Sequence, residues 1–185
     1  MRYSYPHTID NGHGEEITFV RFISTNDGGI LEIENKVKPG AGPPMHVHHL
    51  QDESLTVIQG KIAGQVLGEK TTYHGPGETV TFKRGVAHRF WNAGDDLLIC
   101  RGSVSPAYNL EYFLTAIFES TKGNRTPRPQ FFDGAFLQTR YKSEFDLVEI
   151  PGFVKRVVFP IVTLIGGLTG SHHKFKDCPH PVRQQ

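Results

Sequence analysis

Hydrophobic and polar residues alternate in short runs over roughly the first hundred positions of the chain. β-Branched and aromatic residues dominate these runs, and Gly, Pro, Asn and Asp separate them. The pattern predicts strands over residues 16–24, 29–37, 44–48, 53–59, 61–67, 71–74, 78–82, 87–91 and 97–104. The segment Asn26-Asp27-Gly28-Gly29 tolerates positive φ and predicts a hairpin between the first two. Many short strands without helical patterns between them favour an antiparallel barrel or sandwich.

The periodicity changes near residue 105. An apolar stripe with helical spacing is then formed by Leu110, Phe113, Leu114, Ile117 and Phe118. Ser105-Pro106 precedes this stripe and predicts the N-cap and the first helical position. A second stripe runs over residues 154–165, with a kink expected at Pro160. We therefore expect a β domain, barrel or sandwich, as far as about residue 105, a helical extension over 106–170 packed on it, and a flexible tail over 171–185.

The charge balance limits the classes of partner. The 185 residues include 20 Lys and Arg against 19 Asp and Glu, a net charge of +1. Nucleic-acid binders normally carry a basic surplus, so we expect no nucleic-acid partner. The most apolar stretch, residues 157–165, contains a proline and is much shorter than the about 20 residues of a membrane span. With no apolar signal segment at the N-terminus, we expect a cytoplasmic protein without a membrane span.

Several residues after position 40 point to metal chemistry. On a strand, His46 and His48 face the same side while His49 faces the other, so two imidazoles can meet at one point. Glu53 follows after a turn and can add a carboxylate from the next strand. His88 offers a third imidazole. Three neutral nitrogens and one carboxylate suit a divalent transition metal such as Fe(II), Mn, Ni, Cu or Zn.

Two glycine-anchored signatures resemble those of the cupin family. The first is Gly, five residues, His-x-His, three or four residues, Glu, six residues, Gly, and it is matched by Gly40, His46, His48, Glu53 and Gly60. The second is Gly, five residues, Pro-x-Gly, two residues, His, three residues, Asn, and it is matched by Gly77, Gly85, His88 and Asn92. Lys83 stands where the family usually has proline, a departure that affects a turn and not a ligand.

The resemblance implies a mainly β fold, with a single cupin jelly-roll β-barrel over residues 15–105 and the helical extension lying outside it. It also implies one divalent transition metal at the barrel centre, held by His46, His48, Glu53 and His88. Taken one by one, these residues have plainer interpretations: an exposed edge strand, a solvated turn carboxylate and a core histidine. Single-barrel members commonly dimerise, so we expect a homodimer.

Other residues have two interpretations each. Phe90 shares the parity of His88 and faces the interior, as core packing or as a substrate contact. Arg101, in an apolar strand, either pairs with an acid or lines a pocket for a carboxylate. The Phe-rich helices are core or cover by default. An apolar lid is the sharper interpretation and a membrane-surface helix the weaker one, because Lys155 and Arg156 are the only nearby cations.

Barrel and metal alone leave the function open, because cupins include oxygenases, isomerases, decarboxylases and non-enzymatic binders. Our first hypothesis is a dioxygenase-like oxidoreductase acting on a small, partly apolar molecule, in which Glu53 also moves a proton if it leaves the metal. The second is a non-catalytic module that binds a small molecule. The third is a metal-dependent isomerase or epimerase, which requires a more polar pocket than the expected inward residues provide.

Overall fold

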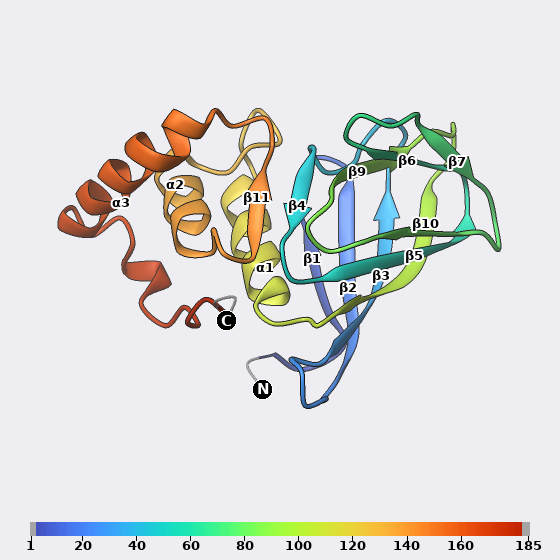
Figure 1. Ribbon diagram of the computed structural model, residues 1–185, viewed down its shortest axis with the longest axis horizontal. Helices are drawn as coiled ribbons and strands as arrows, with labels where there is room; N and C mark the ends of the chain where they lie inside the picture. The colour runs from blue at the N-terminus through green and yellow to red at the C-terminus, as the bar shows by residue number, and fades with distance from the viewer. Residues whose placement is uncertain (1–2, 183–185) are drawn as a thin grey trace.

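The computed structural model describes residues 3–182 and shows two antiparallel sheets followed by a helical region (Figure 1). The strands are β1 (His7–Asp10), β2 (Glu15–Ile23), β3 (Ile30–Val37), β4 (His46–His48), β5 (Asp52–Gln59), β6 (Ile62–Val66), β7 (Thr72–His74), β8 (Thr79–Phe82), β9 (Ala87–Asn92), β10 (Leu98–Ser105) and β11 (Phe145–Leu147). The helices are α1 (Leu110–Thr121), α2 (Phe131–Arg140), the π-helical turn η1 (Val154–Val158), α3 (Phe159–Leu168) and the 3₁₀ turn η2 (His173–Phe175). Every strand expected from the alternation is present within a few residues of its predicted bounds.

The pairing of the strands is that of a jelly roll. One sheet has the order β1-β2-β3-β10-β5-β8, and the other has the order β11-β4-β9-β6-β7. Strands that come early in the barrel segment therefore pair with strands that come late, and the strands between them pair with each other. One sheet contains the pairs β3–β10 and β5–β8, and the other contains β4–β9 and β6–β7. The two sheets face each other without closing into one ladder among the described residues, as in double-sheet jelly rolls.

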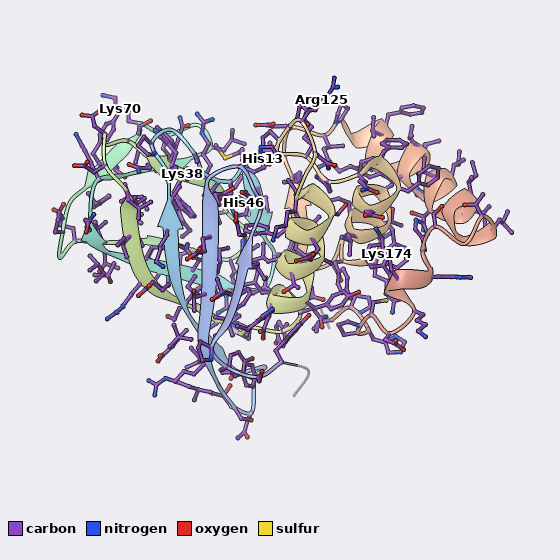
Figure 2. The ribbon with its side chains drawn as sticks, turned by 180° about the vertical axis from the view of Figure 1, so that it is seen from behind. His13, Lys38, His46, Lys70, Arg125 and Lys174 are labelled. Carbon is purple, nitrogen blue, oxygen red and sulfur yellow. The ribbon has the colours of Figure 1, made fainter. Side chains whose placement is uncertain are left out.

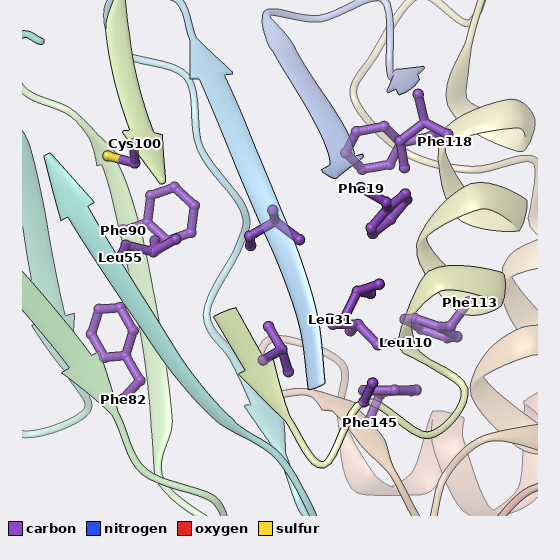
Figure 3. Packing of buried hydrophobic residues seen from close by; sticks show 14 of the residues in the cluster. Phe19, Leu31, Leu55, Phe82, Phe90, Cys100, Leu110, Phe113, Phe118 and Phe145 are labelled. Atoms are coloured by element: carbon purple, nitrogen blue, oxygen red, sulfur yellow. The ribbon is translucent and has the colours of Figure 1, made fainter. Parts of the chain in front are cut away.

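Inward residues of both sheets form the core, which continues into the helices. Along β3, Leu31, Ile33, Asn35 and Val37 are buried at alternate positions, as the two-residue period requires. Figure 3 shows the inner aromatic residues of the barrel and, beside them, the side chains by which α1 joins the same core. The barrel and the start of the helical region therefore share one continuous apolar core.

The first helix begins later than predicted. Ser105 ends β10, and Asn109 is the N-cap residue of α1. The backbone between these residues does not join the helix, because the amides of Ala107 and Tyr108 donate instead to the carbonyls of Gly29 and Gly28. The predicted cap at Ser105-Pro106 was therefore wrong, and these bonds to the β2–β3 hairpin are the reason.

The second helical stripe also differs from expectation. The chain forms the π-helical turn η1 and passes directly into α3, with Pro160 as the second residue of α3. A proline removes one helical hydrogen bond, and the irregular π-helical turn lies immediately before it. In Figure 1, α3 lies beyond α2, on the side of α2 away from the sheets. The segment that contains α3 therefore does not itself cover the barrel.

The last described residues pack against the helices. Phe175 in η2 is buried, and its ring stacks on Phe136 with centroids 4.8 Å apart. Farther along, the Tyr141 hydroxyl donates to the carbonyl of Pro179 (3.0 Å) and the Ser143 hydroxyl to that of Val182. The flexible tail expected over 171–185 is thus held in place as far as residue 182, and its last three residues lie outside the described part. Among the residues that the structure describes, no helix has the length and hydropathy to cross a bilayer.

Candidate metal centre

Three strands bring four potential ligands to one point. His46 and His48 lie on β4, Glu53 on β5 and His88 on β9. His46 and His88 are direct register partners in the β4–β9 pair, and His48 shares the face of His46 because it lies two residues on. One potential ligand atom from each of the four side chains lies within 4.8 Å of the others. This spacing suits a single metal ion.

The four side chains differ in exposure. His88, His48 and Glu53 are buried, with 0%, 6% and 6% of their surface exposed, whereas His46 is only partly buried. His46 lies on the side of the barrel that faces the helical region (Figure 2). The cluster is therefore closed on the side of the core and reaches solvent past His46.

Backbone carbonyls fix the orientation of two of the imidazoles. Nδ1 of His46 lies 2.8 Å from the carbonyl oxygen of Pro44, and Nδ1 of His88 lies 2.8 Å from that of Val86. Since a carbonyl can only accept, Nδ1 carries the proton in both rings, and Nε2 of each neutral ring keeps its lone pair. Metal-binding histidines are commonly oriented by such a bond from the second ring nitrogen.

The lone pairs at the centre meet without a donor between them. Nε2 of His88 lies 3.3 Å from Oε2 of Glu53, so an acceptor nitrogen faces a carboxylate oxygen. In addition, Nδ1 of His48 is buried and has no hydrogen-bond partner among the described residues. A proton on His88 would relieve only the first of these contacts. A cation at the centre would relieve the contact between His88 and Glu53 and could bind one ligand atom from each of the four side chains, so the residues fit a divalent metal.

Burial and the neighbouring groups keep His46 and His48 unprotonated and Glu53 ionised, the forms that can bind a metal. Burial, and then the neighbouring His88, lower the pKa of His46 to about 4. Burial, and then His46, lower the pKa of His48 to about 3. Burial raises the pKa of Glu53, but the contact with His88 and then the electrostatic influence of the neighbouring histidines outweigh burial and lower the pKa to about 2. At neutral pH the centre thus offers neutral imidazoles at His46 and His48 and an ionised carboxylate at Glu53.

Apolar rings enclose the cluster. Phe82 stacks on His88 with centroids 4.2 Å apart and planes 7° from parallel. Phe145 meets His48 edge-on at 5.6 Å and stacks on Phe113 of α1 at 4.5 Å. Sequence reasoning missed Phe145, because β11 is only three residues long and lies inside the segment expected to be helical. The alternation Phe145-Asp146-Leu147 was the one available signal.

Of the two predicted pocket residues, one points into the barrel and the other points outward. Phe90 is buried inside the barrel, as its parity predicted. Arg101 lies on the outer face of β10, with 69% of its side chain exposed, and its Nε donates to Glu34 at 2.9 Å. The structure therefore shows the acid pairing of Arg101, and it places Arg101 away from the metal centre, because outward residues of β10 cannot reach the interior.

The turn that lacks the usual proline is held by ion pairs. Lys83 Nζ lies 3.2 Å from Asp52, and both the backbone amide and Nε of Arg84 also donate to that carboxylate. The amide of Gly85 then donates to the carbonyl of His48 at 2.7 Å. The β8–β9 turn is thus attached directly to the strand that carries two of the histidines.

Comparison with known proteins identifies the domain. The Cupin domain family matches residues 34–100, whereas no curated protein matches the chain. Among solved structures, a putative sugar phosphate isomerase from Acidithiobacillus ferrooxidans is 25% identical over 40% of this chain and 49% of its own length, about half, with a TM-score of 0.37. KdgF from Halomonas sp. is 21% identical over 53% of this chain and 84% of its own, with a TM-score of 0.45. An uncharacterized protein with a double-stranded β-helix domain from Klebsiella pneumoniae is 24% identical over 57% and 78%, with a TM-score of 0.43.

The family match and the jelly-roll pairing concern the same part of the chain. The matched segment runs from within β3 to within β10, and it contains all four side chains of the cluster. Residues 34–100 form a cupin domain, and the four side chains of the cluster lie within it.

Proposed function

We propose that this cupin is a metal-dependent oxidoreductase of the dioxygenase type, acting on a small and partly apolar molecule. His46, His48, Glu53 and His88 would hold one divalent transition metal. The observation that carries the proposal is the centre itself, in which buried lone pairs converge without a donor between them. Bound there, the metal would supply a Lewis-acid and electron-transfer centre.

The ligand count supports a reactive site. Four protein ligands leave two positions open on an octahedral ion, enough for a substrate and a small second reactant. His46 is the only one of the four that is not buried, so a substrate would approach past it. A structural metal site is normally closed by its protein ligands.

The surroundings of the centre support an apolar substrate. Phe82 and Phe145 lie against the histidine rings, and Phe90 is buried in the same interior. These rings exclude water from a reacting molecule. Glu53 would accept a proton from the substrate when it leaves the metal, because it is the one carboxylate of the cluster. Apolar walls of this kind suit oxidation of an apolar molecule better than epimerisation of a sugar.

Metal content and oxygen uptake test the proposal together. The protein would be stripped with a chelator, reconstituted anaerobically with Fe(II) and compared with a His46→Ala/His48→Ala variant and a His49→Ala control. We expect about one iron per chain in the wild type and the control, and loss of iron in the double variant. An oxygen electrode would then screen small phenols, thiols and diketones for uptake that requires the iron-loaded wild type.

The possible outcomes separate the alternatives. Oxygen uptake that the His46→Ala/His48→Ala change abolishes would support the oxidoreductase. Stoichiometric zinc or nickel in the purified protein, with no oxygen uptake by the iron form, would overturn it in favour of isomerisation or simple binding. Failure to bind any of these metals after reconstitution would leave a ligand-binding barrel without metal chemistry.

A further inference from the structure

An apolar stripe lies on the outer side of η1 and α3. Its members recur every three or four residues, so they share one helical face. They are strongly exposed for side chains of their kind: Phe153 (68%), Val157 (41%), Ile161 (53%), Leu164 (66%), Ile165 (44%) and Leu168 (81%). Large contiguous apolar patches are rare on the surface of soluble proteins and mark an interaction site.

The opposite side of the helix is anchored, which fixes this face outward. Phe159 is buried, and its ring lies 6.5 Å from that of Phe131 at the start of α2. Gly166 is also covered, since a side chain there would collide with the His172 ring, 2.3 Å from the position of a Cβ. The helix cannot rotate to bury its exposed face without losing both contacts.

The start of α2 extends the patch. Phe131 and Phe132 are 59% and 38% exposed, and their rings contact each other at 6.1 Å. Since Phe131 also contacts Phe159, the α2 start and the η1–α3 segment form one surface. We call the exposed residues of 131–132 and 153–168 the outer apolar surface.

Charge is segregated around this surface. Residues 122–132 and 150–176 contain seven Lys or Arg and no Asp or Glu, in a chain whose whole net charge is +1. Two of these cations are used internally, Lys155 by Asp146 and Lys174 by Asp133. Arg125, Arg128 and Arg156 are exposed and make no ion pair with a described acidic residue.

The free cations flank the apolar stripe. Arg156 lies within η1 itself, next to Val157. Figure 2 shows Arg125 at the outer tip of the α1–α2 loop. Arg128 follows in the same loop, shortly before Phe131. Exposed apolar side chains rimmed by cations are the pattern of helices that lie in the headgroup region of a bilayer.

We propose that the outer apolar surface docks the protein on an anionic lipid bilayer, with α3 lying in the interface. α3 has ten residues, which at 1.5 Å per residue is far too short to span a bilayer of about 30 Å. Its convex, single-helix shape suits shallow insertion among headgroups. A second copy fits less well, because a two-fold interface would pair this surface with itself, and residues 122–132 and 150–176 contain cations but no carboxylate to pair with them.

Vesicle flotation with matched variants tests this proposal. Wild-type protein would be mixed with vesicles of phosphatidylcholine alone or with 30 mol% phosphatidylglycerol, a fraction on the order used for anionic leaflets. In the test variant, Leu164→Glu/Leu168→Glu, both altered residues are exposed. The control Ile58→Glu/Leu67→Glu introduces the same charge at residues of the barrel that are 49% and 57% exposed. Circular dichroism and metal content would establish that each variant is folded.

We expect the wild type and the control to float with anionic vesicles, and the helix variant to lose on the order of tenfold or more in partitioning. Replacing Arg125, Arg128 and Arg156 with Gln should weaken binding by about fivefold per residue, or about a hundredfold together, and added salt should do the same. The zwitterionic vesicles should bind weakly.

Three results would overturn the proposal. The first is absence of flotation with anionic vesicles by folded wild type. The second is equal loss in the barrel control, which would make the effect one of charge alone. The third is a wild-type dimer by light scattering that the Leu164→Glu/Leu168→Glu change converts to a monomer without any lipid binding, which would assign the surface to a second copy.

Discussion

His46 and His88 lie directly opposite each other across β4 and β9, with ring centroids 4.5 Å apart, although 41 residues of sequence lie between them. Side chains at directly opposed positions of an antiparallel pair share one face, so the register alone turns both imidazoles inward. Each ring is further held by its Nδ1 contact to a backbone carbonyl. The metal centre is thus built into the pairing of the strands.

The first prediction concerns the ligand role of His88. His88→Gln should lower affinity for a divalent transition metal by at least about a hundredfold, because removal of a direct ligand should cost no less than loss of an outer-shell partner. The measurement is calorimetric titration of stripped protein with Zn²⁺ or Co²⁺. His49→Gln is the matched control, since the His49 side chain does not belong to the cluster. Equal affinity in the two variants would exclude His88 as a ligand.

A second prediction tests whether the helical region supports the centre. Phe145→Ala removes a buried ring that packs on both Phe113 and His48, and it should destabilise the protein by about 3–5 kcal/mol. Phe131→Ala is the control, since its ring is 59% exposed and the change should cost less than about 0.5 kcal/mol in solution. Urea unfolding of both variants gives the comparison. Similar costs would mean that β11 contributes little to the core.

The third prediction is acid destabilisation of the metal-free protein. His46 and His48 have pKa values lowered from 6.5 to about 4 and about 3, so the unfolded chain binds more protons than the folded one between these values. Stability is therefore present above pH 6.5 and is lost as the pH falls toward 4 and 3. Glu53, lowered from 4.5 to about 2, adds a further loss with the same sign at lower pH.

Urea unfolding in the presence of chelator at pH values from 7 to 4 measures this loss. Replacing both His46 and His48 with Asn should flatten the profile between pH 6.5 and 4, because the depressed groups are gone. Glu15 contributes with the opposite sign in part of this window, because its pKa is raised to about 7, so the profile is also measured in a Glu15→Gln background. A profile that is flat between pH 6.5 and 4 in that background would contradict the lowered pKa values of His46 and His48. Bound metal should delay the loss, because it competes with protons for the same nitrogens.

The barrel could be predicted because its signals are local. Alternation along strands such as β3 and glycine at the turns are visible within a few residues, and the spacing of His46 and His48 requires only the two-residue period. The convergence of Glu53 and His88 on them depended instead on the family signatures, because no local rule sets which strands become neighbours in space.

The helical region was predicted less well because tertiary contacts decide its details. The start of α1 depends on amides of Ala107 and Tyr108 that bond the distant β2–β3 hairpin. β11 exists because Phe145 pairs with His48 of β4, a partner far away in the sequence. The apolar stripe along α3 was predicted correctly. The sequence pattern alone does not show whether another part of the protein or a binding partner covers that stripe.

The last prediction concerns Glu15, at the start of β2. Burial raises the pKa of this carboxyl to about 7, against the lowering effect of the hydrogen bond that Asn11 Nδ2 donates at 2.8 Å. The folded protein therefore retains a proton there between about pH 4.5 and 7. The stability associated with that proton is fully present below pH 4.5 and is lost as the pH rises through 7.

Glu15→Gln keeps the shape and the acceptor for Asn11 but cannot ionise. It should be more stable than the wild type at pH 8, by on the order of 1 kcal/mol, and the advantage should vanish by pH 4.5. Glu16→Gln is the control on the same strand, because it removes an exposed carboxylate that pairs with Lys36 at 2.9 Å, and it should not stabilise the protein at pH 8. Thermal unfolding of the three proteins at pH 4.5, 6 and 8 distinguishes the cases. A Glu15→Gln variant no more stable than wild type at pH 8 would show that the buried carboxylate is ionised at little cost.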